Sequence, residues 1–207
     1  MPSDPEPDLE PELARALRLL EEIGAEDTDH PRGTLADHLR GTYGLLTGWG
    51  CERDLCLAGL YHSVYGTDVF RTVTVAPDSR GKVAAVIGDN AERLAYVYCA
   101  LVRESLYDNL RTGGPPYAVR NRLDGSSIEL DRDDYAGLVT IDLANRLEQM
   151  PHSRASREQF ASDRPRYVAA IPLLPPAAVA QLRATHVSAA AIVPRRAARR
   201  LRGLLSR

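Results

Sequence analysis

The chain of 207 residues is long enough to form a single domain with a sizeable hydrophobic core. Hydrophobic residues make up 44% and charged residues 26%, as is typical of globular proteins, and a formal net charge of -2 gives no general attraction to nucleic acid or to an anionic membrane. No segment reaches the roughly 18 consecutive apolar residues that a membrane span requires, and the three cysteines lack the CxxC spacing of a zinc site. We therefore expect a cytoplasmic protein without a nucleic-acid or membrane partner.

The N-terminal half predicts a short acidic tail followed by three helices. Residues 1–8 place three prolines among carboxylates and are expected to be disordered, so that a single domain occupies residues 9–207. Apolar residues recur at helical spacing in three segments, which are 11–23, 34–46 and 52–64. Thr34 is placed to cap the second helix. The third is apolar nearly all round, so we expect it to be the most buried element.

The second half continues the helical pattern around one hairpin. Helices are predicted over 79–87, 89–110 and 133–149. Before the last of these, Tyr117–Arg120 and Ile128–Leu130 flank Asp124-Gly125, which is typical of a β-hairpin and would be the only β structure. Residues 155–207 predict three shorter helices separated by prolines. The whole pattern predicts an all-α fold, a helical bundle with one small β-hairpin and extra C-terminal helices.

Two histidines on consecutive predicted helices are the first candidates for chemistry. His38 lies on the apolar face of the second helix and His62 near the end of the third, so antiparallel packing would bring their rings together. Two imidazoles joined by a carboxylate from another helix form a metal site in helical bundles, and 141–149 is the candidate helix. By pattern alone, a hydrogen-bonded pair of core histidines is the commoner outcome.

The order of the motifs resembles the HD superfamily of metal-dependent phosphohydrolases, most closely the branch that hydrolyses the alarmone ppGpp. The resemblance covers about residues 28–150. It rests on four segments in order, which are Arg32-Gly-Thr-Leu-Ala-Asp-His38, Leu57-Ala-Gly-Leu-Tyr-His62-Ser63, Gly88-Asp-Asn-Ala-Glu-Arg-Leu-Ala95 and Asp142-Leu-Ala-Asn-Arg-Leu-Glu-Gln149. The run His62-Ser-Val-Tyr-Gly-Thr67 also looks like a bacterial family of unknown function. The resemblance implies an HD-like helical domain with a divalent metal (Mn, Fe or Zn).

The sequence departs from the superfamily pattern at the acidic positions. Ser63 stands at the defining aspartate, Asn145 stands in direct register with the distal aspartate, and tyrosine, glycine and threonine replace the acidic pair that activates water. Because divalent cations prefer anionic oxygen ligands, these losses should lower metal affinity. Asp142 lies three residues before Asn145 on nearly the same helix face and offers a substitute carboxylate. A metal site would then consist of His38, His62 and Asp142, with His30 approaching from the preceding turn.

The resemblance also assigns roles around this site. His62, Ser63 and Tyr65 become candidate catalytic residues, and the candidate substrate contacts are Arg32, Thr67 and Asn145. Each assignment has a plainer alternative. Ser63 would simply cap its helix, Arg32 would be a solvated surface arginine, and without metal the same polar side chains would line a neutral cavity for a small ligand. A Ser63 nucleophile activated by histidine lacks the surrounding G-x-S-x-G motif.

The leading functional expectation is a divergent HD-type enzyme that acts on a small polar or phosphorylated molecule, by metal-dependent hydrolysis where metal is bound. The alternatives are a non-catalytic descendant that binds a small ligand or stabilises a partner, and an HD-type iron oxygenase. Hydrolysis of ppGpp itself is not expected, because the acidic pair is missing. The arginine-rich segment 194–207 predicts a basic amphipathic helix. We expect it to contact the acidic N-terminal segment or a second subunit of a homo-oligomer rather than nucleic acid or membrane.

Overall fold

The structure, a computed structural model, describes residues 9–30 and 33–185. Three expectations therefore lie outside the described residues: the disordered tail 1–8, the substrate contact Arg32, and the last predicted helix with its arginine-rich segment 194–207.

In the described part of the chain, nine α-helices and two short antiparallel strand pairs form the fold. The α-helices are α1 (Leu9–Glu22), α2 (Leu35–Gly48), α3 (Arg53–Leu60), α4 (Arg80–Ile87), α5 (Asp89–Ala100), α6 (Arg103–Thr112), α7 (Arg132–Gln149), α8 (Arg154–Ala169) and α9 (Pro176–Ala184). Single 3-10 turns lie at Pro77–Ser79, Met150–His152 and Ile171–Leu173. The strands are β1 (Asp29–His30) with β2 (Gly33–Thr34), and β3 (Tyr117–Arg120) with β4 (Ser127–Leu130). The expected all-α fold with a small hairpin and additional C-terminal helices is confirmed.

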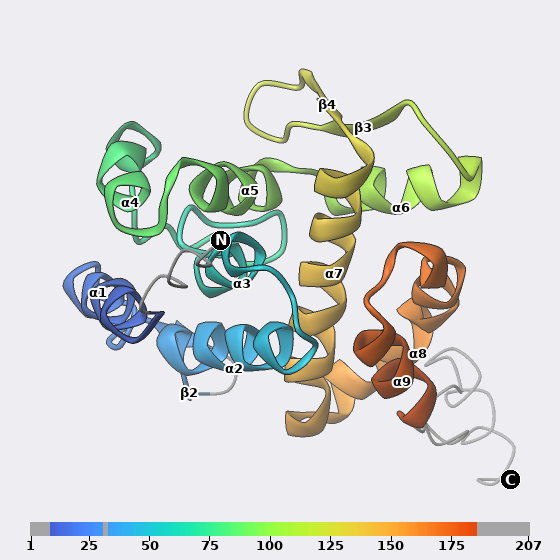
Figure 1. The fold of residues 1–207 in the computed structure, drawn as a ribbon, viewed down its shortest axis with the longest axis horizontal. Coiled ribbons are helices and arrows are strands. Elements are labelled where there is room, and N and C mark those ends of the chain that lie inside the picture. The colour runs from blue at the N-terminus through green and yellow to red at the C-terminus, as the bar shows by residue number, and fades with distance from the viewer. Residues whose placement is uncertain (1–8, 31–32, 186–207) are drawn as a thin grey trace, which may run out of the picture.

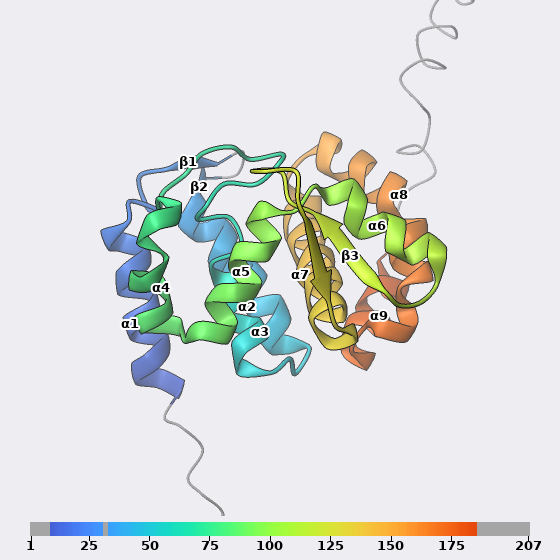
Figure 2. The same cartoon turned by 90° about the horizontal axis from the view of Figure 1, so that it is seen from above.

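Helix α7 runs through the middle of the molecule. Helices α1 to α4 lie on one side of it, α8 and α9 lie on the other, and the β3–β4 hairpin lies across its N-terminal end (Figures 1 and 2). The position of α7 follows from its sequence, since Tyr135, Leu138, Ile141 and Leu143 are fully buried. None of the helices in the described ranges is long and apolar enough to cross a lipid bilayer.

Helix α2 begins where the sequence predicts. The Thr34 hydroxyl accepts a hydrogen bond from the Asp37 backbone N–H, and the Asp37 carboxylate accepts one from the Thr34 N–H. This reciprocal capping box satisfies two of the donors that every helix start leaves unpaired. It fixes the first turn of the helix that carries His38.

The predicted helix 89–110 is in fact two helices. The break lies at Leu101 and Val102, where the chain becomes extended and pairs with the end of the hairpin. The Val102 N–H donates to the Arg120 carbonyl at 2.8 Å, and the Arg122 N–H donates to the Ala100 carbonyl at 2.7 Å. A helical pattern within one segment cannot reveal this break, because the partners that cause it lie about 20 residues away.

Two further boundaries differ from the prediction. Helix α3 ends at Leu60, and the chain continues through turns, so His62 follows the helix instead of forming its end. The Val64 carbonyl there accepts the N–H groups of Thr74 and Val75 from the returning loop. The β1–β2 pair was not predicted, because strands of two residues leave no periodic signal.

Two glycines let the helices around the histidines approach closely. A side chain at Gly59 of α3 would overlap Leu46 of α2. A Cβ atom at Gly41 of α2 would lie 2.8 Å from Cγ of Glu148 on α7. A Cβ atom at either crossing would force Leu46 or Glu148 to shift, so the two glycines let α2 pack closely against α3 and α7. His38, one turn before Gly41, is thereby placed between His62 and Glu148.

Candidate functional site

Three histidines that are far apart in the sequence meet near the C-terminal end of α7. The ring of His30 stacks on that of His38, with centroids 4.3 Å apart and planes inclined by 8°. His38 and His62 meet edge to face, and their Nε2 atoms lie 3.2 Å apart. On its other side, Nδ1 of His38 makes a short contact with the Glu148 carboxylate. The predicted convergence of the two helical histidines is present, and Glu148 is a partner that the sequence analysis missed.

Hydrogen-bond partners determine where the protons of the histidine pair lie. The Gly59 carbonyl, 2.7 Å from Nδ1 of His62, can only accept, so Nδ1 carries the proton. Burial, reinforced by the neighbouring His38, lowers the pKa of His62 to about 3, so Nε2 is an acceptor at neutral pH. The 3.2 Å contact is therefore a hydrogen bond donated by Nε2 of His38. This bond occupies the His62 nitrogen that a metal ion or Ser63 would need.

Asp142 does not join the histidines, contrary to the expected ligand set. Its Oδ1 accepts hydrogen bonds from Tyr98 Oη at 2.9 Å and from Nη1 of Arg103. Its Oδ2 accepts from Tyr107 Oη at 2.6 Å and from Tyr167 Oη at 2.7 Å. Both oxygens of this fully buried carboxylate are thus occupied by protein donors. We call Asp142 with these four donors the tyrosine cage.

The charge of Asp142 is stabilised inside the cage. Burial opposes its ionisation, but the guanidinium groups of Arg103 and Arg146, together with the tyrosine hydroxyls, hold the pKa of Asp142 below its ordinary value. Burial raises the pKa of Tyr98 and Tyr167 well above the usual range, so both hydroxyls stay protonated as donors. Asp142 is therefore an ionised carboxylate whose two oxygens are bonded by side chains of the protein core.

The side chains present do not fit the divalent metal that the resemblance implies. Asp142 lies in the tyrosine cage, and the positions that would supply further carboxylates carry Ser63 and Asn145. Within the ranges that the structure describes, no group of three or more His, Cys, Asp or Glu side chains is arranged to hold a metal ion. The expected set of His30, His38, His62 and Asp142 is accordingly not assembled.

A cavity of about 130 Å³ lies beside the histidines. It is lined by His30, His38, Ser63, Thr67, Val69, Phe70, Arg103, Asn145, Arg146 and Gln149. The loop after α3 supplies its apolar rim, and α7 supplies three of its polar side chains. Four of the predicted site residues besides the histidines and Asp142 were Ser63, Tyr65, Thr67 and Asn145, and all of these except Tyr65 line this cavity.

Two arginines that the sequence analysis did not single out dominate the chemistry of the cavity. Arg103 has a side chain only 8% exposed and uses Nη1 to bind Tyr98 and Asp142. Its Nε is buried without a hydrogen-bond partner. Arg146 is 14% exposed, and its Nε lies 3.4 Å from Asp163 without forming a hydrogen bond. No hydrogen bond from any guanidinium nitrogen of Arg146 to another described residue is present, so this side chain brings unused donors to the cavity.

Two further polar side chains of the cavity, Thr67 and Asn145, are also oriented to donate. The Thr67 hydroxyl accepts from the backbone N–H groups of Val69 and Phe70 at 3.3 and 2.9 Å, which leaves its own proton available. Asn145 donates from Nδ2 to Tyr98 at 3.0 Å, and its Oδ1 accepts from Gln149 at 2.5 Å. The side-chain oxygens of Thr67 and Asn145 thus accept hydrogen bonds from the protein, while the Thr67 O–H and one Asn145 N–H keep donor capacity. The cavity therefore suits a ligand that presents acceptor oxygens.

Tyr65, an expected catalytic residue, does not face this cavity. Its hydroxyl donates to Oε1 of the buried Glu92 at 2.8 Å, and Arg80 binds both oxygens of the same carboxylate. The ring of Tyr65 packs edge to face on Tyr96. Tyr65 therefore belongs to a structural cluster that joins the loop after α3 to α4 and α5.

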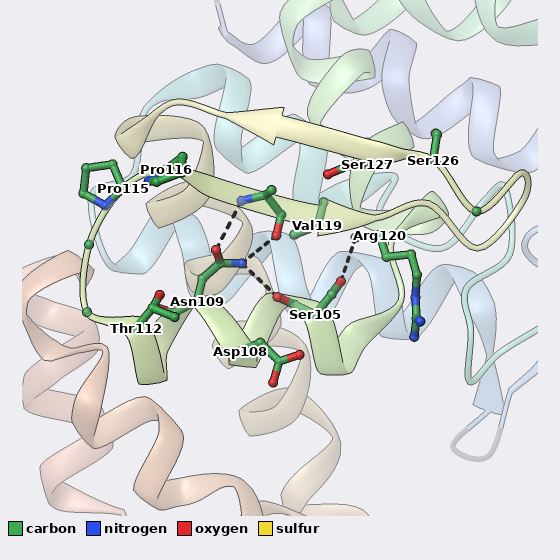
Figure 3. A pocket seen from close by; sticks show the side chains of 14 residues that line it. Ser105, Asp108, Asn109, Thr112, Pro115, Pro116, Val119, Arg120, Ser126 and Ser127 are labelled. Atoms are coloured by element: carbon green, nitrogen blue, oxygen red, sulfur yellow. Dashed lines mark hydrogen bonds between the residues drawn. The ribbon is translucent and has the colours of Figure 1, made fainter.

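A larger, more open hollow of about 680 Å³ lies between α6 and the hairpin (Figure 3). The Asn109 side chain crosses it and bonds both backbone groups of Ala118, donating to the carbonyl at 2.8 Å and accepting from the N–H at 3.2 Å. The Ser105 hydroxyl accepts from the Arg120 N–H at 2.9 Å. These side chains hold the hairpin on α6. Because the polar side chains of this hollow already bond the backbone of the hairpin, the histidine cavity is the better candidate site.

Comparison with known proteins adds one finding. A family model described as a domain of unknown function (DUF6817) matches residues 19–103, from within α1 to the start of α6. No curated protein and no solved structure matches the chain. The matched segment contains the three histidines and Ser63 but ends before Asn145 and Arg146. The cavity therefore combines side chains from inside and outside the matched segment.

Proposed function

We propose that this protein binds a small polar molecule in the cavity beside His38, with Arg103 and Arg146 as the main donors, and that binding needs no divalent metal. The observation that carries the proposal is the guanidinium of Arg146. It is largely buried and lines the cavity, yet it makes no hydrogen bond within the described residues. Its terminal nitrogens bond no other described residue, and ligand oxygens would supply the acceptors that the protein does not.

The size of the cavity limits the ligand. A volume of about 130 Å³ corresponds to roughly four water molecules at their share of liquid volume. Only a small molecule, or one small group of a larger molecule, fits. The surrounding donors favour a carboxylate, a phosphoryl group or a polyhydroxylated compound over an apolar ligand.

The cavity supports binding better than hydrolysis. Ser63 has no hydrogen bond to a histidine within the described residues, and Nε2 of His62 is already paired with His38. The carboxylates that would hold a metal or activate water are replaced or, for Asp142, bound by four protein donors. These replaced or occupied carboxylates favour binding over the metal-dependent hydrolysis that the resemblance suggests. The non-catalytic alternative fits the observed donors.

A thermal-unfolding screen of the full chain tests the proposal. Small carboxylates, phosphate and sulfate, amides and polyols would be added singly to the chelator-treated protein. A ligand present at about 100 times its Kd stabilises the folded state by about 2.7 kcal/mol, which raises the Tm by about 5–10 °C for a domain of this size. We expect at least one class to produce such a shift and R146Q to abolish it.

The matched control is R154Q, since Arg154 has a side chain 76% exposed and lies on α8 away from the cavity lining. This variant should respond to ligand as the wild type does. Two results would overturn the proposal. One is the absence of a shift with every compound class. The other is a near-stoichiometric metal in the purified protein whose removal by chelator abolishes the ligand response.

A further inference from the structure

The two arginines of the cavity are already surrounded by carboxylates. Arg103 forms an ion pair with Asp142 and lies 3.6 Å from Asp68, measured from Nε to Oδ1. Arg146 lies 3.4 Å from Asp163, whose side chain is only 1% exposed. Asp163 also forms an ion pair with Arg166 at 2.8 Å, so among the described residues three arginines meet three aspartates here. The cavity offers many donors but little uncompensated positive charge.

The histidines do little to change this balance. Burial keeps the pKa of His62 at about 3, so this ring is neutral at physiological pH. His38 lies against Glu148, so any positive charge on its ring is matched by a carboxylate. A ligand entering the cavity therefore meets hydrogen-bond donors whose positive charge is already balanced by carboxylates. Such a site accepts one negative charge far more readily than two, because like charges repel strongly where water is excluded.

We infer that the ligand held here is a small, singly charged carboxylic acid rather than a phosphate or sulfate dianion. This inference rests on the proposed function and names the ligand class of the same cavity. A carboxylate presents two coplanar oxygens that match the parallel N–H groups of a guanidinium, and Arg146 has such groups unused. Val69 and Phe70 at the rim leave an apolar surface for the short carbon chain of such an acid.

The same geometry gives the other donors a role. The available protons of Thr67 and of the Asn145 amide can reach a second ligand oxygen, such as the hydroxyl of a hydroxy acid. We therefore expect lactate to bind more tightly than acetate. Both should bind at least tenfold more tightly than inorganic phosphate or sulfate.

Equilibrium titration of the full chain at pH 7.5 and constant ionic strength tests the inference with acetate, lactate, phosphate and sulfate as probes. Sulfate is fully a dianion at pH 7.5, so it reports how a doubly charged tetrahedral anion binds. The decisive variant is D68N, which removes a carboxylate beside Arg103 but keeps an oxygen for the hydrogen bond that Asp68 accepts from the Arg103 N–H. We expect D68N to bind sulfate and phosphate more tightly than the wild type does. The ratio of their Kd values to those of the carboxylates should therefore decrease. E104Q, a change at an exposed glutamate, should leave the preference unchanged.

The outcomes separate this inference from the proposed function. Tighter binding of carboxylates together with a narrowed preference in D68N supports both. Binding of phosphate or sulfate as tight as that of lactate overturns the carboxylate inference and leaves the binding function standing. Binding of neutral amides or polyols alone also overturns it. If none of these anions and none of the neutral compounds of the unfolding screen binds, the proposed function fails as well. Far-UV circular dichroism of each variant shows that it is folded, so a lost response cannot be mistaken for unfolding.

Discussion

At the residue scale, Asp142 connects more of the fold than its place in a motif suggests. It lies on α7, and its four donors come from α5, α6 and α8. The Tyr98 hydroxyl also accepts from Arg103 and from Asn145, so the tyrosine cage orients two side chains of the cavity. The residue that the motif suggested as a metal ligand is instead the anion that positions the donors of the site.

Replacement of Asp142 by asparagine should be strongly destabilising. The change removes the nearer of the two carboxylates beside the buried Arg103, and breaking a buried ion pair costs about 3–5 kcal/mol. Urea unfolding of D142N measures the loss of unfolding free energy. D133N is the control, because Asp133 lies on the same helix with a side chain 96% exposed and should change stability by no more than about 0.5 kcal/mol. Equal, small effects of both substitutions would contradict the cage.

His62 should make the stability of the protein sensitive to mild acid. Its pKa is about 3 in the folded state against an ordinary value of 6.5 for histidine, so between these values the unfolded chain binds one more proton. The free energy of unfolding therefore falls as the pH falls through this window, approaching about 1.4 kcal/mol per pH unit for one proton. Asp142 has a similar effect at lower pH. Because its pKa in the folded state lies below the ordinary value, ionised Asp142 stabilises the folded protein above about pH 4, and this stabilisation is lost on further acidification.

Denaturation midpoints between pH 7.5 and 5 measure this slope. H62Q lacks the titrating ring. The slope of its unfolding free energy against pH should therefore be smaller than that of the wild type, by roughly 1 kcal/mol per pH unit. H152Q removes an exposed histidine and should retain the slope of the wild type. A slope in H62Q equal to that of the wild type would show that another group carries the acid sensitivity.

At the scale of the elements, the crossing of α2 and α3 sets the separation of His38 and His62. The G59A variant should be destabilised, because the added methyl overlaps the fully buried Leu46 and overpacking typically costs 1–3 kcal/mol. G44A is the matched substitution on the exposed face of α2, where an added Cβ has nothing within 4 Å. It should gain up to about 1 kcal/mol from helix propensity. Thermal unfolding of the two variants should therefore show shifts of opposite sign.

The sequence predicted the elements whose causes are local. Thr34 and Asp37 lie three residues apart and cap α2 as expected, and the hairpin follows from its own turn residues. The break at Leu101 could not be predicted, because it depends on backbone pairing with the hairpin. For the same reason the sequence could not decide between Asp142 and Asn145. Both lie one turn apart on a buried face, and tyrosines from other helices determine which of them lines the cavity.

At the scale of the whole molecule, the C-terminal helices α8 and α9 form side-chain hydrogen bonds with the helices that precede them. Trp49 is the single tryptophan of the chain, lies 6% exposed at the end of α2, and donates from Nε1 to Oε1 of Gln181 on α9 at 2.7 Å. Tyr167 of α8 reaches the tyrosine cage. Although the family model stops at residue 103, the helices beyond it complete the core.

This continuity predicts a single unfolding transition. Tryptophan fluorescence reports the docking of α9, and circular dichroism at 222 nm reports the helices as a whole. The two signals should show the same urea midpoint, as expected for one cooperative unit. A fluorescence transition at clearly lower urea would show instead that α8 and α9 detach first, and that the preceding helices form a separately stable domain.

The contacts of Asn109 with Ala118 have a consequence for solubility. A two-stranded sheet exposes rows of backbone donors and acceptors that can recruit strands of other molecules and start aggregation. On the β3 side, an amide side chain imitates a neighbouring strand and blocks this recruitment, with Ser105 continuing the same edge. The helix that supports the hairpin therefore also covers the free edge of β3. The small sheet can lie at the surface without pairing with strands of other molecules along that edge.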